Sequence, residues 1–135
     1  MQVVIGVGSA TVLVVDDDYV FLDVVKRMLL REGYQVLPSA CPSEALETVR
    51  KLGAVDVVLS DIIMPEMPGT ELVREIGEVS PRIARVLMTA GHVDSANLPD
   101  GVPVLQKPFS RWDLICAVEA ALARSAPMNV TPKSQ

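Results

Sequence analysis

The stretch VLVVDDDYV, residues 12–20, joins an apolar, β-branched run to three consecutive aspartates, Asp16, Asp17 and Asp18. The apolar part is typical of a buried strand. Neighbouring carboxylates repel each other, by roughly 4 kcal/mol for two unit charges about 4 Å apart at an effective dielectric constant of ~20. The sequence therefore predicts a strand whose carboxyl end needs a cationic partner.

Similar β-branched runs alternate with segments of helical period along the chain. The predicted strands are Thr11–Val15, Gln35–Ser39, Val55–Ser60, Arg85–Thr89 and Val104–Gln106. The predicted helices are Tyr19–Arg31, Pro42–Leu52, Thr70–Val79 and Arg111–Arg124, the last with Ser110 and Asp113 in capping-box spacing. Continuous apolar strands that alternate with helices indicate a parallel sheet covered on both faces, which is a three-layer α/β sandwich.

The segment GHVDSANLPDGVP, residues 91–103, separates the fourth and fifth predicted strands. It has two glycines, two prolines and no sustained apolar period, so we expect the helix between these strands to be short or missing.

A chain of 135 residues, half of them apolar, is expected to form one globular domain. We place that domain at residues 11–124. Residues 1–10 are an N-terminal lead, an extra strand or the remnant of a longer parent protein, and the polar, proline-containing residues 125–135 are expected to be a disordered tail.

Charge and composition exclude several functional classes. The formal net charge is -5 and no basic cluster is visible, so direct nucleic-acid binding is not expected. No apolar run approaches the ~20 residues of a membrane span, and the N-terminus lacks the basic region of a signal peptide. The two cysteines, Cys41 and Cys116, have no disulfide or zinc-like pattern and are interpreted as thiols in a reducing cytosol. We therefore expect a cytoplasmic protein.

Polar side chains follow most of the predicted strands. Asp16 and Asp17 end the first strand, Asp61 follows the third, Thr89 ends the fourth and Lys107 follows the fifth. In open α/β sheets ligands bind beyond the carboxyl ends of the strands, so these residues are expected to converge. The three carboxylates and Lys107 sum to a charge of -2, which one Mg²⁺ would neutralise. Aspartate can act as a covalent nucleophile toward phosphoryl groups, and hydroxyl and ammonium groups suit phosphoryl oxygens. The constellation predicts an aspartyl phosphate.

Four motifs resemble the receiver domains of two-component response regulators. VLVVDDD, VVLSDIIMPEMPG, VLMTA and LQKPF occur in the order of that family and cover residues 11 to about 124. The resemblance implies a flavodoxin-like three-layer sandwich with a five-stranded parallel sheet of order 2-1-3-4-5. It also implies a phosphorelay function, with a sensor histidine kinase or a histidine phosphotransfer protein as the partner. The resemblance does not decide whether the domain forms a weak dimer.

The resemblance assigns a role to each matched position. Asp61 is the expected phosphorylation site, and Asp16, Asp17, Asp61 and the backbone carbonyl of Ile63 are the expected Mg²⁺ site, with Asp16 acting through water. Lys107 is expected to pair with the phosphorylated aspartate, and Thr89 to move its hydroxyl toward the phosphoryl group. Pro108 is a candidate cis-proline in the K-P pattern. Asp18 lies beyond the acidic pair and is interpreted as a cap of the first helix.

The sequence departs from the family at the residue whose side chain is expected to move together with the threonine when the domain switches conformation. Family members usually have Tyr or Phe three residues before the lysine, where this chain has Val104. A valine has no ring to reorient, so we expect the coupling from Thr89 to the usual output face to be absent or rebuilt. Ile63 and Gly91 flank the expected route of a hydrolytic water and cannot orient it, so no strong built-in phosphatase function is predicted. The shortened segment and the LQKPF ending also resemble receivers of hybrid sensor histidine kinases.

Two other functions are considered. Residues 16–20 also fit D-x-D-x-[TV], which resembles the opening motif of haloacid-dehalogenase-type phosphatases with Asp16 as nucleophile. That interpretation needs a second acidic motif after Lys107, where only Asp113 and Glu119 follow, both on the predicted last helix. The other is a docking module that keeps the pocket without being phosphorylated. No independent enzymatic output is expected.

Overall fold

The computed structural model describes residues 10–125. Its elements, in chain order, are β1 (Thr11–Val15), α1 (Tyr19–Arg31), β2 (Gln35–Ser39), α2 (Pro42–Leu52), β3 (Val57–Asp61), α3 (Gly69–Val79), β4 (Ala84–Thr89), a 3-10 turn η2 (Ser95–Asn97), β5 (Val104–Gln106) and α4 (Arg111–Arg124). Within this range no helix is both long enough and apolar enough to cross a bilayer. The predictions for residues 1–9 and 126–135 fall outside the described residues, while Ser125 is the C-cap of α4.

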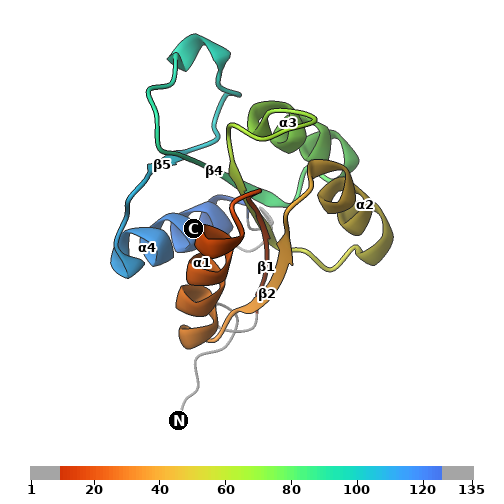
Figure 1. Ribbon diagram of the computed structural model, residues 1–135. Helices are drawn as coiled ribbons and strands as arrows, with labels where there is room; N and C mark the ends of the chain where they lie inside the picture. Colours follow the sequence, from red (N-terminus) through yellow and green to blue (C-terminus); the bar gives the residue numbers. More distant parts are fainter. Residues whose placement is uncertain (1–9, 126–135) are drawn as a thin grey trace, which may run out of the picture.

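The five strands form one parallel sheet with the order β2-β1-β3-β4-β5, as predicted. Helices α1 and α4 cover one face of this sheet and α2 and α3 cover the other, which gives the expected three layers (Figure 1). Because all strands run in the same direction, their carboxyl ends lie along one edge of the sheet.

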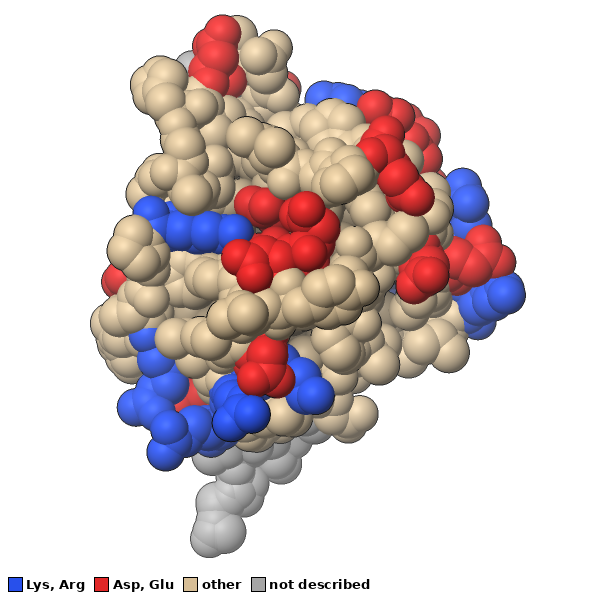
Figure 2. Space-filling model, in the orientation of Figure 1, with Lys and Arg blue, Asp and Glu red and all other residues tan. Residues whose placement is uncertain are grey.

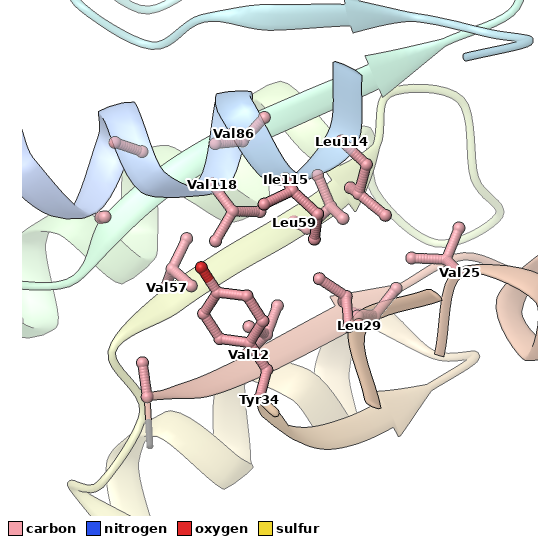
Figure 3. Close-up of a cluster of buried hydrophobic side chains, with 14 of the residues drawn as sticks. Val12, Val25, Leu29, Tyr34, Val57, Leu59, Val86, Leu114, Ile115 and Val118 are labelled. Carbon is pink, nitrogen blue, oxygen red and sulfur yellow. The ribbon is translucent and has the colours of Figure 1, made fainter. Parts of the chain in front are cut away.

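The apolar residues of β1 explain why both faces can be covered. Val12 and Val14 pack with α1 and α4, whereas Leu13 and Val15 pack with α2 and α3. All four are at most 1% exposed, so the alternation of a strand sends an apolar side chain into each core in turn. Figure 3 shows the first core, where Leu29 of α1 and Ile115 and Val118 of α4 meet the sheet.

Two helix starts have the predicted caps. The carboxylate of Asp18 accepts hydrogen bonds from the backbone N–H groups of Val20 and Phe21 at the start of α1. At the start of α4, Ser110 and Asp113 form a reciprocal capping box. Each cap satisfies backbone donors that have no partner inside the helix.

The bounds of three elements differ from the predictions. The third strand is Val57–Asp61 rather than Val55–Ser60, because its ladder begins where Val57 lies opposite Val12 and Ala84. Asp61 is therefore the last residue of the strand. α3 and β4 each begin one residue earlier than predicted, at Gly69 and Ala84.

The segment between β4 and β5 has no α-helix, which confirms the predicted shortened or missing helix. Its one regular feature is η2, a turn of three residues. The half-buried side chains of Val93 and Leu98 and the buried Val102 pack against the core on the α2–α3 side. In Figure 1 the segment stands away from the helices that flank it.

Strand β2 lies at one edge of the sheet and contains Pro38. Gln35 N–H donates to Ala10 and the Ser39 carbonyl accepts from Asp16, so these two residues face β1. Pro38 lies opposite Val14 between these bonded residues, and the alternation of a parallel strand turns its nitrogen toward the open side of β2.

Candidate functional site

Three carboxylates meet at the carboxyl ends of the central strands. Asp16 and Asp17 directly follow β1, and Asp61 ends β3, the neighbouring strand. One oxygen from each of the three lies within 4.8 Å of the others. Figure 2 shows a red acidic patch at the centre of this face, with a blue side chain running into its edge. We call Asp16, Asp17 and Asp61 the acidic cluster.

Asp16 is the innermost member of the acidic cluster. It is 0% exposed, and both of its carboxylate oxygens have a partner: Oδ1 accepts from the backbone N–H of Asp18 at 2.9 Å, and Oδ2 accepts from Lys107 Nζ at 2.9 Å. A buried charge is tolerated only when it is paired and hydrogen-bonded. Asp17, by contrast, is exposed and free to reach a ligand at the surface.

Lys107 is the cation that the opening aspartates were predicted to need. Its ammonium lies 2.9 Å from Asp16 Oδ2 and 3.4 Å from Asp61 Oδ1, and its side chain is 15% exposed. Nζ also lies 4.1 Å from the centre of the Phe21 ring, a cation–π contact. Phe21 in turn packs edge-to-face with Phe109, with ring centres 5.6 Å apart.

The contact between Lys107 and Phe21 was not anticipated from the sequence. Phe21 lies in the predicted first helix, and Phe109 is the last residue of the LQKPF motif. Their packing across two elements has no local signal in the chain. The two rings form an apolar wall that limits the positions available to the ammonium group.

The pKa of Asp61 is raised above the ordinary value of a carboxyl group. The main cause is burial, followed by the negative charge of Asp16, while Lys107 acts in the opposite direction. The side chain is 13% exposed. Asp61 is thus an anion held in an unfavourable environment, from which a cation or a covalent partner would relieve it.

Thr89 and Val104 do not join the acidic cluster in this structure. Thr89 is 2% exposed, and its hydroxyl oxygen accepts a hydrogen bond from the backbone N–H of Gly91 at 3.1 Å. Val104 lies opposite Leu87 in the sheet and packs half-buried into the core on the α2–α3 side. The backbone N–H of Lys107 donates to the Thr89 carbonyl at 2.7 Å, and the Lys107–Pro108 peptide bond is cis.

The loop from residue 62 to residue 68, which follows Asp61, is held close to β3. Ile62 donates a backbone hydrogen bond to Met88, and its carbonyl accepts one from Gly69 at 2.7 Å. A Cβ atom at position 69 would overlap the Asp61 carbonyl, so only glycine fits there. Ile63 follows in this loop and is 72% exposed.

The chemistry of this site is that of a hard-oxygen cation site. Three carboxylates and one ammonium leave a charge of -2 at the surface of the sheet. Carboxylate oxygens at this density are the ligands that small divalent cations prefer. Asp16, with both oxygens occupied, is poorly placed as a nucleophile, whereas Asp61 keeps one oxygen that does not contact Lys107.

Known proteins with similar sequences have the same domain. The family model for the response regulator receiver domain matches residues 12–119. The chain is 39% identical over 127 residues to the sensor kinase CckA of Brucella abortus (strain 2308), which covers 87% of this chain and 13% of that protein. It is 34% identical over 126 residues to the transcriptional regulatory protein GlrR of Escherichia coli (strain K12), covering 87% of this chain and 27% of that protein. The chain thus spans under a third of either relative.

Solved structures of receiver domains have the same fold as this chain. A response regulator receiver domain protein from Clostridium thermocellum superposes with a TM-score of 0.77 at 32% identity, covering 85% of this chain and 95% of that one. The receiver domain of the hybrid histidine kinase CckA superposes with a TM-score of 0.73 at 27% identity, covering 84% and 99%.

These matches also argue against one of the two alternatives raised by the sequence, the phosphatase. The motif that resembles haloacid-dehalogenase-type phosphatases needs Asp16 as nucleophile, and the family matched here is one of receiver domains without an independent catalytic output. The chain belongs to the response regulator receiver domain family and is a receiver domain of two-component signal transduction.

Proposed function

We propose that Asp61 accepts a phosphoryl group from a phosphohistidine on a sensor histidine kinase or a histidine phosphotransfer protein. The observation that carries this proposal is the position of Lys107, whose ammonium lies between Asp16 and the end of Asp61. A lysine in this place neutralises part of the charge of the acidic cluster and leaves Asp61 available to a donor.

The acidic cluster fits Mg²⁺ as cofactor, since it consists of oxygen donors whose charge exceeds that of the neighbouring lysine. We propose that Asp17 and Asp61 hold the ion directly, Asp16 holds it through water and the Ile63 carbonyl is a further ligand. The bound ion would supply positive charge that offsets the repulsion between carboxylates and phosphoryl oxygens.

In the proposed transfer, an oxygen of Asp61 forms a bond to phosphorus while the bond from phosphorus to the donor's imidazole nitrogen breaks. Lys107 then pairs with the phosphorylated side chain. Its present contact with Asp61, at 3.4 Å, supports this role because little movement is required. Thr89 would turn its hydroxyl away from Gly91 and toward the phosphoryl oxygens. Val104 has no aromatic ring, so the rotation of a ring would not accompany this movement.

The parent and partners of this domain are also proposals. We place the receiver at residues 11–124 of a cytoplasmic protein that signals by protein contact, without binding nucleic acid directly. Similarity to the receiver region of a sensor kinase supports a hybrid kinase as the parent, although similarity to GlrR supports a response regulator equally. A weak dimer is compatible with either.

The experiment that tests the proposed function is the intact mass after incubation with acetyl phosphate. One phosphoryl adduct is expected in Mg²⁺, none in chelator and none in Asp61→Asn. Glu44→Gln is a matched control, because Glu44 is an exposed acid outside the acidic cluster. A folded wild type that takes no adduct under any condition would instead support a docking module.

A further inference from the structure

Glu66, in the loop after Asp61, has a backbone conformation that side chains rarely adopt. Its φ is 77°, and it is the single non-glycine residue with positive φ in the part of the chain that the structure describes. Such a conformation is unfavourable for an L-residue and persists where surrounding contacts require it. The question is what Glu66 contacts.

The carboxylate of Glu66 reaches the start of α2, a different element. Oε1 accepts a hydrogen bond from the backbone N–H of Ser43 at 3.2 Å, and the Cys41 thiol lies 3.4 Å from both carboxylate oxygens. The N-cap residue of α2, Cys41, makes no side-chain capping bond of its own. Glu66 therefore caps α2 from another part of the chain and brings a negative charge to the positive end of the helix.

The same loop is held at its base near the acidic cluster. Hydrogen bonds from Ile62 to Met88 and from Gly69 to Ile62 close it beside Asp61, and a Cβ atom at position 69 would overlap the Asp61 carbonyl. Ile63 lies between this base and Glu66. The loop is thus attached at two places, one at the end of β3 and one at α2.

We infer that Glu66 is a positioning residue for the divalent-cation site, because its bond to α2 fixes the loop that follows Asp61 and supplies the Ile63 carbonyl. This inference rests on the proposed function. Groups that orient metal ligands without touching the metal typically contribute about 10-fold or more to metal affinity.

A purely structural role would look different. If Glu66 only caps α2, its loss lowers stability and leaves the affinity for Mg²⁺ unchanged. The two roles separate in Glu66→Gly, which removes the carboxylate and also relieves the unfavourable φ. This variant should be nearly as stable as the wild type and still bind Mg²⁺ more weakly.

The test measures the dissociation constant for Mg²⁺ by isothermal titration calorimetry in the full chain. Glu66→Ala and Glu66→Gly are expected to weaken binding by about 10-fold. Glu66→Gln keeps an oxygen acceptor for Ser43 and should recover most of the affinity. Glu44→Gln is the matched control, because it removes an exposed carboxylate from the first turn of the same helix and should change nothing.

The alkylation rates of the two cysteines test the contact between Glu66 and the start of α2. Cys41 touches Glu66, whereas Cys116 is exposed on α4 and serves as an internal control. Alkylation by iodoacetamide, followed by peptide mass spectrometry, should be several-fold faster at Cys41 in Glu66→Ala than in the wild type, with Cys116 unchanged.

Two outcomes would overturn the inference. A Mg²⁺ affinity within twofold of wild type in both Glu66→Ala and Glu66→Gly, with the wild type phosphorylated normally, contradicts it and leaves the proposed function standing. A wild type that neither binds Mg²⁺ nor takes a phosphoryl group overturns the proposed function and the inference with it.

Discussion

The β3–β4 connection and the β4–β5 connection both start at the same edge of the sheet, but they differ in structure. The first has a closely held loop and a helix of 11 residues, whereas the second, residues 90–103, has one turn of three residues. The acidic cluster and Lys107 come from the ends of β1, β3 and β5, and residues 90–103 supply none of them. The acidic cluster and its lysine are therefore assembled without a full fourth crossover helix.

A pair of glycines gives the largest expected difference between the two connections. Gly69→Ala should lower the free energy of unfolding by about 3 kcal/mol, since its Cβ would overlap the Asp61 carbonyl. Gly91→Ala, at the start of the other connection, meets no atom within 4 Å and should stay within about 0.5 kcal/mol of wild type. Urea denaturation measures both. Equal stabilities would contradict the comparison.

Removing the ammonium from the acidic cluster should have the next largest effect. Lys107→Met leaves the buried Asp16 without its partner and should cost about 2 kcal/mol of stability in chelator. Mg²⁺ should restore more stability to this variant than to the wild type, because the ion replaces the lost charge.

The control for Lys107→Met is Lys51→Met, which breaks an exposed pair with Glu47 on α2. It should cost less than about 0.5 kcal/mol, with no dependence on Mg²⁺. A loss for Lys107→Met as small as this control would mean that Asp16 is stabilised by other groups.

Asp61→Asn should stabilise the protein at pH 7 in chelator, which would be measured as a higher melting temperature than that of the wild type. The pKa of Asp61 is raised in the folded state, so the folded wild type holds its proton more tightly than the unfolded chain does. Wild-type stability therefore falls as the pH rises from the ordinary carboxyl pKa through the raised value. The advantage of the variant should disappear near pH 4, which melting curves from pH 4 to pH 7 would test.

Asp23→Asn, which removes an exposed carboxylate from a pair with Arg27, is the control for the Asp61 measurement. It should show no comparable gain at any pH. A pH-independent difference between Asp61→Asn and wild type would show that charge burial is not the cause.

The smallest effect is expected in the β4–β5 connection. Asp94 Oδ1 accepts a hydrogen bond from Ala96 N–H at 3.0 Å and stabilises the start of η2. Asp94→Ala should cost about 0.5 kcal/mol locally, seen as faster hydrogen exchange in residues 90–103. Phosphorylation by acetyl phosphate should be unchanged. A slower reaction would link this connection to the site and break the comparison.

Much of this architecture could be predicted from the sequence. The strand order, the missing helix and the caps at Asp18 and Ser110 follow from apolar periodicity, local capping patterns and the family resemblance. The predicted start of β3, Val55, was wrong. A strand is paired only where its neighbouring strands are also extended, and an apolar run in the sequence does not show where those neighbours begin. Periodicity is a local property, whereas pairing is not.

The site was predictable in composition but not in contacts. The convergence of Asp16, Asp17, Asp61 and Lys107 follows from strand ends in a parallel sheet. The shorter contact of Lys107 with Asp16 rather than Asp61, and the cap that Glu66 provides to α2, depend on side-chain directions across separate loops. No pattern of residue spacing contains that information.

Pro38 has a consequence for how such a domain behaves at high concentration. An open sheet has two edges at which another chain could add a strand and begin a fibril. On β2 the proline removes a donor from the open side, and on the opposite edge β5 has only three residues to offer. Neither edge is a good template for strand addition. The domain should therefore have little tendency to polymerise through the edges of its sheet, even at high concentration.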